Sequence, residues 1–213
     1  MPLYARRVLF ACLVLLWMSG AASAQTAGTF ALGLDVGTKV ATHDGATGHP
    51  NVGVLWRFGH GRDGWGWEYG LSWYSAELEQ PIADIAPTGF GELHVRPILG
   101  GYGYSRRAGR HSVSAKLLGG YAFNSFELHP SFDDTYRQRL GATSVTTDAS
   151  NGFVLKPELS AWVDLGRKIG LRASAAYMVS RPGVTVTSSL GRDHRHINAD
   201  VLMLKIGAVY SIF

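Results

Sequence analysis

Cysteine is almost absent from this sequence. The only one among 213 residues, Cys12, lies in an apolar stretch near the N-terminus that we expect to be removed on export. The remaining chain then holds no disulfide, so a folded domain depends on its backbone hydrogen bonds and its packing. The excess of positive over negative charge is small too. The formal net charge is only +4, and Arg6 and Arg7 of that stretch supply two of the positive charges. The balance excludes the strongly basic surface typical of nucleic-acid-binding domains, and we expect no nucleic-acid partner.

Long apolar runs are equally rare, and the clearest one covers residues 8–18. It is shorter than the roughly 20 residues that a transmembrane helix needs. Two arginines precede it, and the small residues at 22–24 follow it as an Ala-Ser-Ala cleavage site. This order is typical of a secretory signal peptide. We therefore expect residues 1–24 to be cleaved and residues 25–213 to form one exported domain.

The sequence does contain a period-two alternation that recurs in eight segments. In the first of them the apolar positions are Phe30, Leu32, Leu34 and Val36, and small or charged residues lie between them. Such alternation predicts β-strands with two chemically different sides. The expected strands cover residues 29–40, 51–58, 65–75, 90–104, 111–124, 152–164, 171–180 and 198–213.

The connections between these segments alternate in length. Short turns are expected at residues 59–64, 105–110 and 165–170. Longer loops are expected at residues 41–50, 76–89, 125–151 and 181–197. Alternating long and short connections are typical of barrels that cross an outer membrane, with the short turns in the periplasm.

Residue size indicates which side of the strands faces outward. The apolar sets carry most of the large rings, whereas the other sets carry small residues such as Gly33, Gly53, Ser114 and Ser160. An eight-stranded barrel has room inside only for its own side chains, so the small residues belong inside. Tryptophan and tyrosine concentrate where a membrane meets water. We predict an outward aromatic girdle made of Trp56, Phe58, Trp65, Trp67, Tyr69, Trp73, Phe153 and Tyr210.

In these features the chain resembles the small eight-stranded outer-membrane β-barrel family, of the OmpA/OmpX type. The resemblance implies an all-β fold, an eight-stranded antiparallel up-and-down transmembrane β-barrel, located in the cell outer membrane. It also implies that the terminal Phe213 is an assembly signal for the barrel-assembly machinery. Phe213 lies one step out of phase with Tyr210 and Ile212, so either a bulge restores the phase or the signal is weakened.

Charged residues gather on the side of the strands that we expect to face the lumen. An isolated ion in a narrow lumen is costly, which favours pairing between opposite charges. The predicted lumen ion-pair network consists of Arg57, Glu68, Glu92, His94, Arg96, Lys116, Lys156, Glu158, Arg172 and Lys205, and Asp35, Lys39 and Asp164 fall on the same side. The network either fills the barrel and fixes its register or lines a gated, narrow ion path.

Two prolines interrupt the strand pattern. Pro97 and Pro157 fall inside predicted strands, and proline cannot donate to a ladder. A closed barrel has no free edge at which to place them. A bulge or a locally broken pair is expected at each.

The long loops carry the candidate surface contacts. Arg181, Arg192 and Arg195 are predicted to contact phosphates of lipopolysaccharide. His194 and His196 lie in the same loop, but two histidines are too few for a metal site, so we expect no metal and no cofactor. Loop 125–151 is the longest and is the expected place for an unknown extracellular ligand.

Catalytic chemistry has little support in the sequence. A His-x-Ser pair occurs at His129-Pro130-Ser131, on a predicted loop away from the lipid face. We therefore predict a non-enzymatic integral outer-membrane barrel with a structural or surface-interaction role, in contact with outer-membrane lipids. The alternatives are a soluble periplasmic barrel that binds a small apolar ligand, a narrow porin-like channel, and a lipid A-modifying enzyme.

Overall fold

The computed structural model describes residues 30–41, 47–59, 63–80, 88–130, 134, 137 and 141–212. The predicted signal peptide, Cys12 and the terminal Phe213 lie outside these residues. None of the helices in the described parts of the chain is long and apolar enough to cross a membrane.

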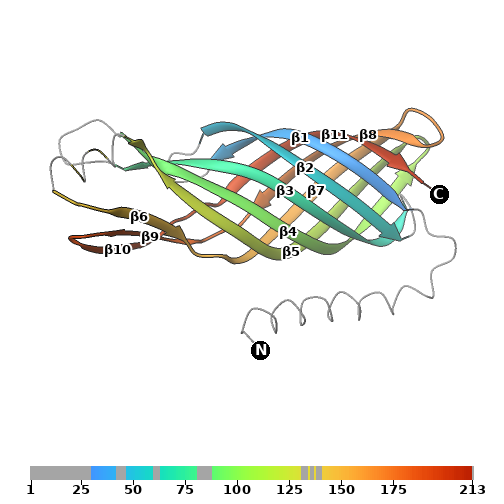
Figure 1. Cartoon of the computed structure of the whole chain (residues 1–213). Coiled ribbons are helices and arrows are strands. Elements are labelled where there is room, and N and C mark those ends of the chain that lie inside the picture. The colour runs from blue at the N-terminus through green and yellow to red at the C-terminus, as the bar shows by residue number, and fades with distance from the viewer. Residues whose placement is uncertain are drawn as a thin grey trace.

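Eight antiparallel strands close into one barrel, in the order β1-β11-β8-β7-β5-β4-β3-β2 (Figure 1). Each strand pairs with its sequence neighbour in the barrel, and β1 pairs with β11 to close it. The predicted eight-stranded up-and-down barrel is therefore confirmed. The barrel strands are β1 (Ala31–Ala41), β2 (Thr47–Gly59), β3 (Gly64–Gln80), β4 (Thr88–Ala108), β5 (His111–Leu128), β7 (Gly152–Asp164), β8 (Ile169–Met178) and β11 (Val201–Ser211).

The structure contains more strand than the sequence predicts, and most of the excess lies at one end. β3 and β4 have 17 and 21 residues, and both continue into the segment expected to be a loop. The strands β6 (Val145–Ala149), β9 (Gly183–Ser188) and β10 (Gly191–His196) form a separate sheet in the order β10-β9-β6. This sheet extends from the barrel end opposite the C-terminus (Figure 1). It occupies parts of two expected loops, where alternating valine and threonine favour a strand.

The two ends of the barrel differ in their connections. β4 and β5 are joined by Gly109 and Arg110 alone, and Gly109 adopts a φ of 60° that suits glycine in a tight turn. This turn lies at the end where the C-terminus emerges (Figure 1). Short turns mark the periplasmic end of outer-membrane barrels. The β6-β9-β10 sheet then lies on the extracellular side.

The ladder beside Pro97 is locally broken. Between β3 and β4, the pairing passes from Leu71↔Ile98 directly to Tyr74↔Val95, with no change of register across the gap. Proline has no N–H to donate, which explains the missing pairs. The predicted broken pair is confirmed on the β3 side, while pairing with β5 is continuous.

A similar break occurs beside Pro157. The β7–β8 ladder stops at Glu158↔Ala176 and resumes as a single bridge at Leu155↔Val179, again in the same register. Pairing of Pro157 with β5 is uninterrupted. Both prolines are therefore accommodated by losing hydrogen bonds to one neighbour, without a bulge.

Two glycines of the inner face make room for charged side chains. A Cβ atom at Gly53 would meet the carboxylate of Asp35. One at Gly103 would meet the side chain of Lys116 and the facing backbone. Glycine at these positions therefore leaves the space that the side chains of Asp35 and Lys116 occupy in the lumen.

Toward the extracellular end the interior becomes apolar. Leu93, Val95, Met178 and Met203 are fully buried there, at 0% exposure. The β6-β9-β10 sheet contributes Ala149, Val184 and Val186 to this core, so its base packs against the end of the barrel. The core cluster consists of Tyr74, Leu93, Val95, Leu99, Leu118, Ala122, Phe126, Ala149, Val154, Met178, Val184, Val186, Ala199, Val201 and Met203.

Candidate functional site

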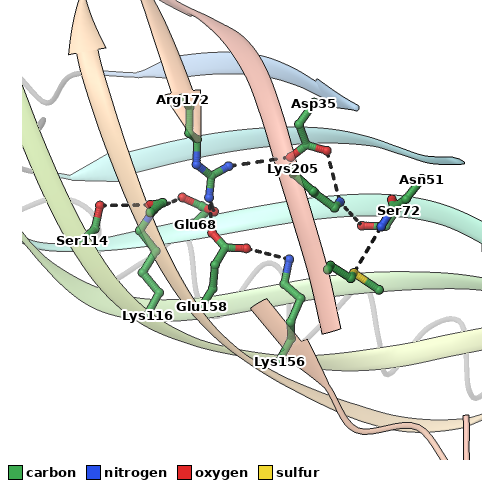
Figure 2. Close-up of polar contacts among 12 residues, drawn as sticks. Asp35, Asn51, Glu68, Ser72, Ser114, Lys116, Lys156, Glu158, Arg172 and Lys205 are labelled. Atoms are coloured by element: carbon green, nitrogen blue, oxygen red, sulfur yellow. Dashed lines mark hydrogen bonds and ion pairs between the residues drawn. The ribbon is translucent and has the colours of Figure 1, made fainter. Parts of the chain in front are cut away.

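Arg172 is the centre of a charged layer inside the membrane-spanning half of the barrel (Figure 2). Its Nη2 donates to Glu68 Oε1 at 2.9 Å and also to Glu158. Its Nη1 lies 3.8 Å from Asp35 Oδ2. One guanidinium from β8 thus joins carboxylates from β1, β3 and β7, because its fork of donors can reach several oxygens at once.

Each of these carboxylates also has a lysine partner. Lys116 pairs with Glu68, which Arg172 also contacts. Lys156 Nζ lies 2.9 Å from Glu158 Oε2, and Lys205 Nζ donates to Asp35 Oδ1 at 3.1 Å. All of these side chains are buried. Buried ions need such multiple pairing, because removing a charge from water costs several kcal/mol that only good partners offset.

Two further groups mark the limits of the charged layer. Arg57 donates to Ser105 Oγ at 2.6 Å near the periplasmic end. Asn51 donates to Met203 Sδ at 3.2 Å, where the ionic layer meets the apolar core. Lys205 also donates to Ser72 Oγ at 3.3 Å (Figure 2).

The structure places seven of the ten predicted network residues in the lumen. They are Arg57, Glu68, Lys116, Lys156, Glu158, Arg172 and Lys205. Asp35, which the sequence places on the same side, belongs to this group as a partner of both Arg172 and Lys205. The sequence could not show that Asp35 is central, because its partners lie 137 and 170 positions away.

The other three predicted members, Glu92, His94 and Arg96, are on the opposite side of β4, so their assignment to the lumen is wrong. Leu93 and Val95 point inward and are fully buried, whereas Arg96 is exposed. The physical reason is that β4 reaches the edge of the bilayer near Arg96 and continues beyond it. There the outside is water, so apolar residues turn inward and polar residues turn outward. The same alternation of inward and outward residues along β4 places Tyr102 and Tyr104 on the outer wall.

His94 has its own partners on this outer surface. Its Nδ1 lies 4.0 Å from Glu92 Oε1, and its Nε2 lies 3.9 Å from Glu127 Oε1. Both distances are at the limit for an ion pair. Exposed pairs of this kind contribute little to stability.

The outer wall of the membrane-spanning half is apolar. In the described chain, its exposed large residues include Leu32, Leu34, Val36, Val52, Ile98, Val113, Leu117, Leu155, Leu159, Leu171, Leu204 and Ile206. Exposure of so many aliphatic side chains is incompatible with water as the surrounding solvent. It matches the lipid-facing band of a transmembrane barrel.

All eight residues of the predicted girdle face outward. Trp65 stacks on Tyr102 at 5.4 Å between ring centroids, and Trp67 lies 4.8 Å from the same ring. Trp56 stacks on Tyr69 at 6.3 Å. These rings gather at the periplasmic ends of neighbouring strands. Phe58 and Tyr210 lie at the same end, and Trp73 and Phe153 lie toward the extracellular side.

Trp162 differs from these tryptophans because it points into the barrel. It packs with Ala31 and Val209 near the periplasmic end, and its Nε1 donates to Asp164 Oδ1 at 3.0 Å. Asp164 also accepts from Arg107 at 3.2 Å. Trp162 therefore forms an apolar floor beneath the charged layer. Its inward position follows from the alternation of β7, because buried Ser160 precedes it by two residues.

The cations predicted to contact lipopolysaccharide do not converge on one point. Arg181 lies 3.9 Å from Asp200 where the chain leaves the barrel, and Arg195 pairs with Asp193 at 2.9 Å on β10. Arg192 is exposed beside the β9–β10 turn. The surface of β10 is cationic, but it is not a pocket.

The loop histidines interact with their neighbours. His194 shares a hydrogen bond of 2.9 Å with Thr185, and its ring centroid lies 5.1 Å from that of His196. Among the residues that the structure describes, no group of three or more histidines, cysteines and carboxylates could hold a metal ion. His129 is exposed, and Ser131 of the His-x-Ser pair lies outside the described residues.

Comparisons with known proteins agree with this architecture. No family model matches the chain, and no curated protein matches its sequence. Its structure is similar to that of the outer membrane protein OprG from Pseudomonas aeruginosa, with a TM-score of 0.68 and 14% identity over 88% of this chain and 97% of that one. A major outer membrane protein from Thermus thermophilus has a TM-score of 0.58 and 13% identity over 88% and 100% of the two chains.

A third similar structure is that of the outer membrane protein AlkL in lipid bilayers. It has a TM-score of 0.58 and 13% identity, over 88% of this chain and 92% of that one. Identities this low show a shared fold only. Together with the closed barrel and its apolar outer wall, they identify the chain as a small eight-stranded transmembrane β-barrel of the outer-membrane type, placed in the outer membrane.

Proposed function

We propose that this protein is a non-enzymatic outer-membrane barrel with a structural and surface-interaction role, and that its lumen does not conduct. The observation that carries this proposal is the filling of the barrel interior. A floor at Trp162, a paired ionic layer around Arg172 and an apolar core around Leu93 follow one another along the axis. The first two layers resemble the packed interior expected for a barrel of eight strands.

The apolar layer is the main argument against an ion path. An ion that leaves the charged layer would next meet fully buried side chains such as Met178, Met203 and Leu93. Moving an ion into surroundings without polar partners is very costly. A porin-like channel would require this whole layer to rearrange.

The extracellular extension supports a role in surface interaction. β10 is an edge strand of its sheet, and in the described chain it pairs only with β9. It carries Arg192, His194, Arg195 and His196 against one carboxylate, Asp193. A cationic strand in this position is suited to anionic partners, including the phosphates of neighbouring lipopolysaccharide.

Conductance across a planar lipid bilayer tests the closed lumen. We expect the full-length protein to give no steady single-channel currents in concentrated salt, whereas a lumen wide enough for hydrated ions would give them. The matched comparison is a double variant, Met178→Gly with Met203→Gly, which thins the apolar layer and leaves the ionic layer unchanged. Steady currents from the unaltered protein would refute the proposal, whereas currents from the double variant alone would support it.

A further inference from the structure

Arg96 lies on the outer wall, close to where the membrane band ends. Its cross-strand partner on β5 is Phe123, and both side chains are exposed. Toward the periplasm, the next outward residue of β4 is Ile98, which is 52% exposed and paired with Tyr121. In the other direction come His94 and then Glu92. Arg96 is therefore the first charged residue met when the apolar row of β4 is followed toward the cell exterior.

The rings beside Arg96 locate this position within the membrane. Tyr121 lies 5.5 Å from both Phe123 and Phe153, measured between ring centroids. These three exposed rings lie on β5 and β7, at the extracellular side of the apolar band. Aromatic residues gather at the level of the lipid headgroups. The guanidinium of Arg96 therefore lies at the headgroup level of the outer leaflet.

Within the described chain, Arg96 has no ion-pair or hydrogen-bond partner. The carboxylates of Glu92 and Glu127 instead flank His94, one outward step farther from the membrane. An arginine at the edge of hydrocarbon is stable only if it reaches water or an anion. Phosphate suits a guanidinium well, because two parallel N–H donors match two phosphate oxygens.

We propose that Arg96 binds a phosphate of lipid A in the outer leaflet. Ile98, Tyr121 and Phe123 then form the apolar surface against which the acyl chains of that lipid lie. The proposal rests on the placement of the barrel in the outer membrane. It does not depend on the closed lumen or on the partner of the extracellular sheet, so the conductance experiment and the lipid experiment can fail independently.

The test uses the full-length protein folded into phosphatidylcholine nanodiscs. Binding of lipid A is compared with binding of the same lipid after both phosphates have been removed. We expect the unaltered protein to prefer the phosphorylated form about tenfold, the factor that corresponds to one charge-assisted hydrogen-bond pair. Arg96→Gln should abolish the preference, and Arg96→Lys should retain part of it, because lysine keeps the charge but loses the fork.

Arg106→Gln is the matched control. Arg106 is also exposed on the outer side of β4, but it lies near the periplasmic end. Its replacement should leave the preference for phosphorylated lipid A unchanged. Heat-modifiable migration of each variant on a gel verifies that the barrel has folded.

Three results would overturn the proposal. The first is an undiminished preference in the folded Arg96→Gln variant, and the second is equal loss in Arg106→Gln. The third is equally tight binding of phosphatidylglycerol by the unaltered protein, because the site would then accept any lipid phosphate and would not select lipid A.

Discussion

The membrane-spanning half of this barrel and its extracellular half have opposite polarity. In the first, ions such as Arg172 and Glu68 are inside and aliphatic side chains are outside. In the second, Leu93 and Val95 are inside, while Glu92 and His94 are outside. β4 passes through both halves. Its inward row runs from apolar residues such as Leu93 to Gly103, which faces Lys116.

The difference shows that the surroundings of the wall decide what the interior contains. Above the membrane, water surrounds the wall, and burial of apolar surface drives Leu93 and its neighbours inward as in any soluble domain. Within the membrane, hydrocarbon surrounds the wall, so apolar residues gain nothing by turning inward. Charged side chains there must face the lumen, because each one on the lipid side costs several kcal/mol.

The largest expected effect is that of Arg172→Leu. The variant leaves Glu68, Glu158 and Asp35 without their shared cation in a closed lumen. We expect it to lower the free energy of unfolding by about 4 kcal/mol, as when one partner of a buried ion network is removed. Urea-induced unfolding in lipid vesicles, followed by tryptophan fluorescence, measures the change. Arg167→Leu, at an exposed turn, is the control, and equal stability of the two variants would contradict a central role for Arg172.

The next largest effect is expected when an arginine is introduced on the outer wall of the membrane-spanning half. The same change on the outer wall of the extracellular half is the comparison. Val36→Arg places a cation on the lipid-facing band and should cost about 3 kcal/mol. Ser125→Arg places it on the outer side of β5 beyond the membrane, next to His94, and should change stability by less than about 0.5 kcal/mol. The same unfolding measurement applies to both. Similar costs at the two positions would show that the boundary between the halves is placed wrongly.

A loss smaller than those of Arg172→Leu and Val36→Arg should come from Leu93→Ala in the extracellular core. Loss of a fully buried leucine costs about 2 kcal/mol where the surroundings can relax, as expected near a barrel mouth. We expect faster proteolysis of the extracellular extension at an unchanged heat-modifiable migration of the barrel. A matching loss of the whole barrel would mean that the two halves unfold as one unit.

Much of the membrane-spanning half could be predicted from the sequence, because its strands are regular. Leu32, Leu34 and Val36 alternate with small or charged residues, and the structure keeps that frame. The broken pairs at Pro97 and Pro157 also follow from local chemistry, since proline has no N–H. These predictions depend only on neighbours along the chain.

The residues of β4 that face inward, and the presence of the extracellular sheet, could not be predicted in the same way. A strand that leaves the membrane reverses its polarity, and the sequence around Arg96 does not state where the membrane ends. The strands β6, β9 and β10 pair across segments far apart in the chain, as Thr147 of β6 does with Val186 of β9. Short polar strands such as β10 carry no alternation that distinguishes them from a loop.

The sequence by itself determined an all-β barrel with eight membrane-crossing strands, because period-two alternation and connection lengths are local properties of the chain. Only the tertiary structure decided which charges meet in the lumen and that Arg96 lies on the outer wall. Closure of the barrel brings together residues more than a hundred positions apart, and the height of each side chain relative to the membrane depends on the stagger of all eight strands.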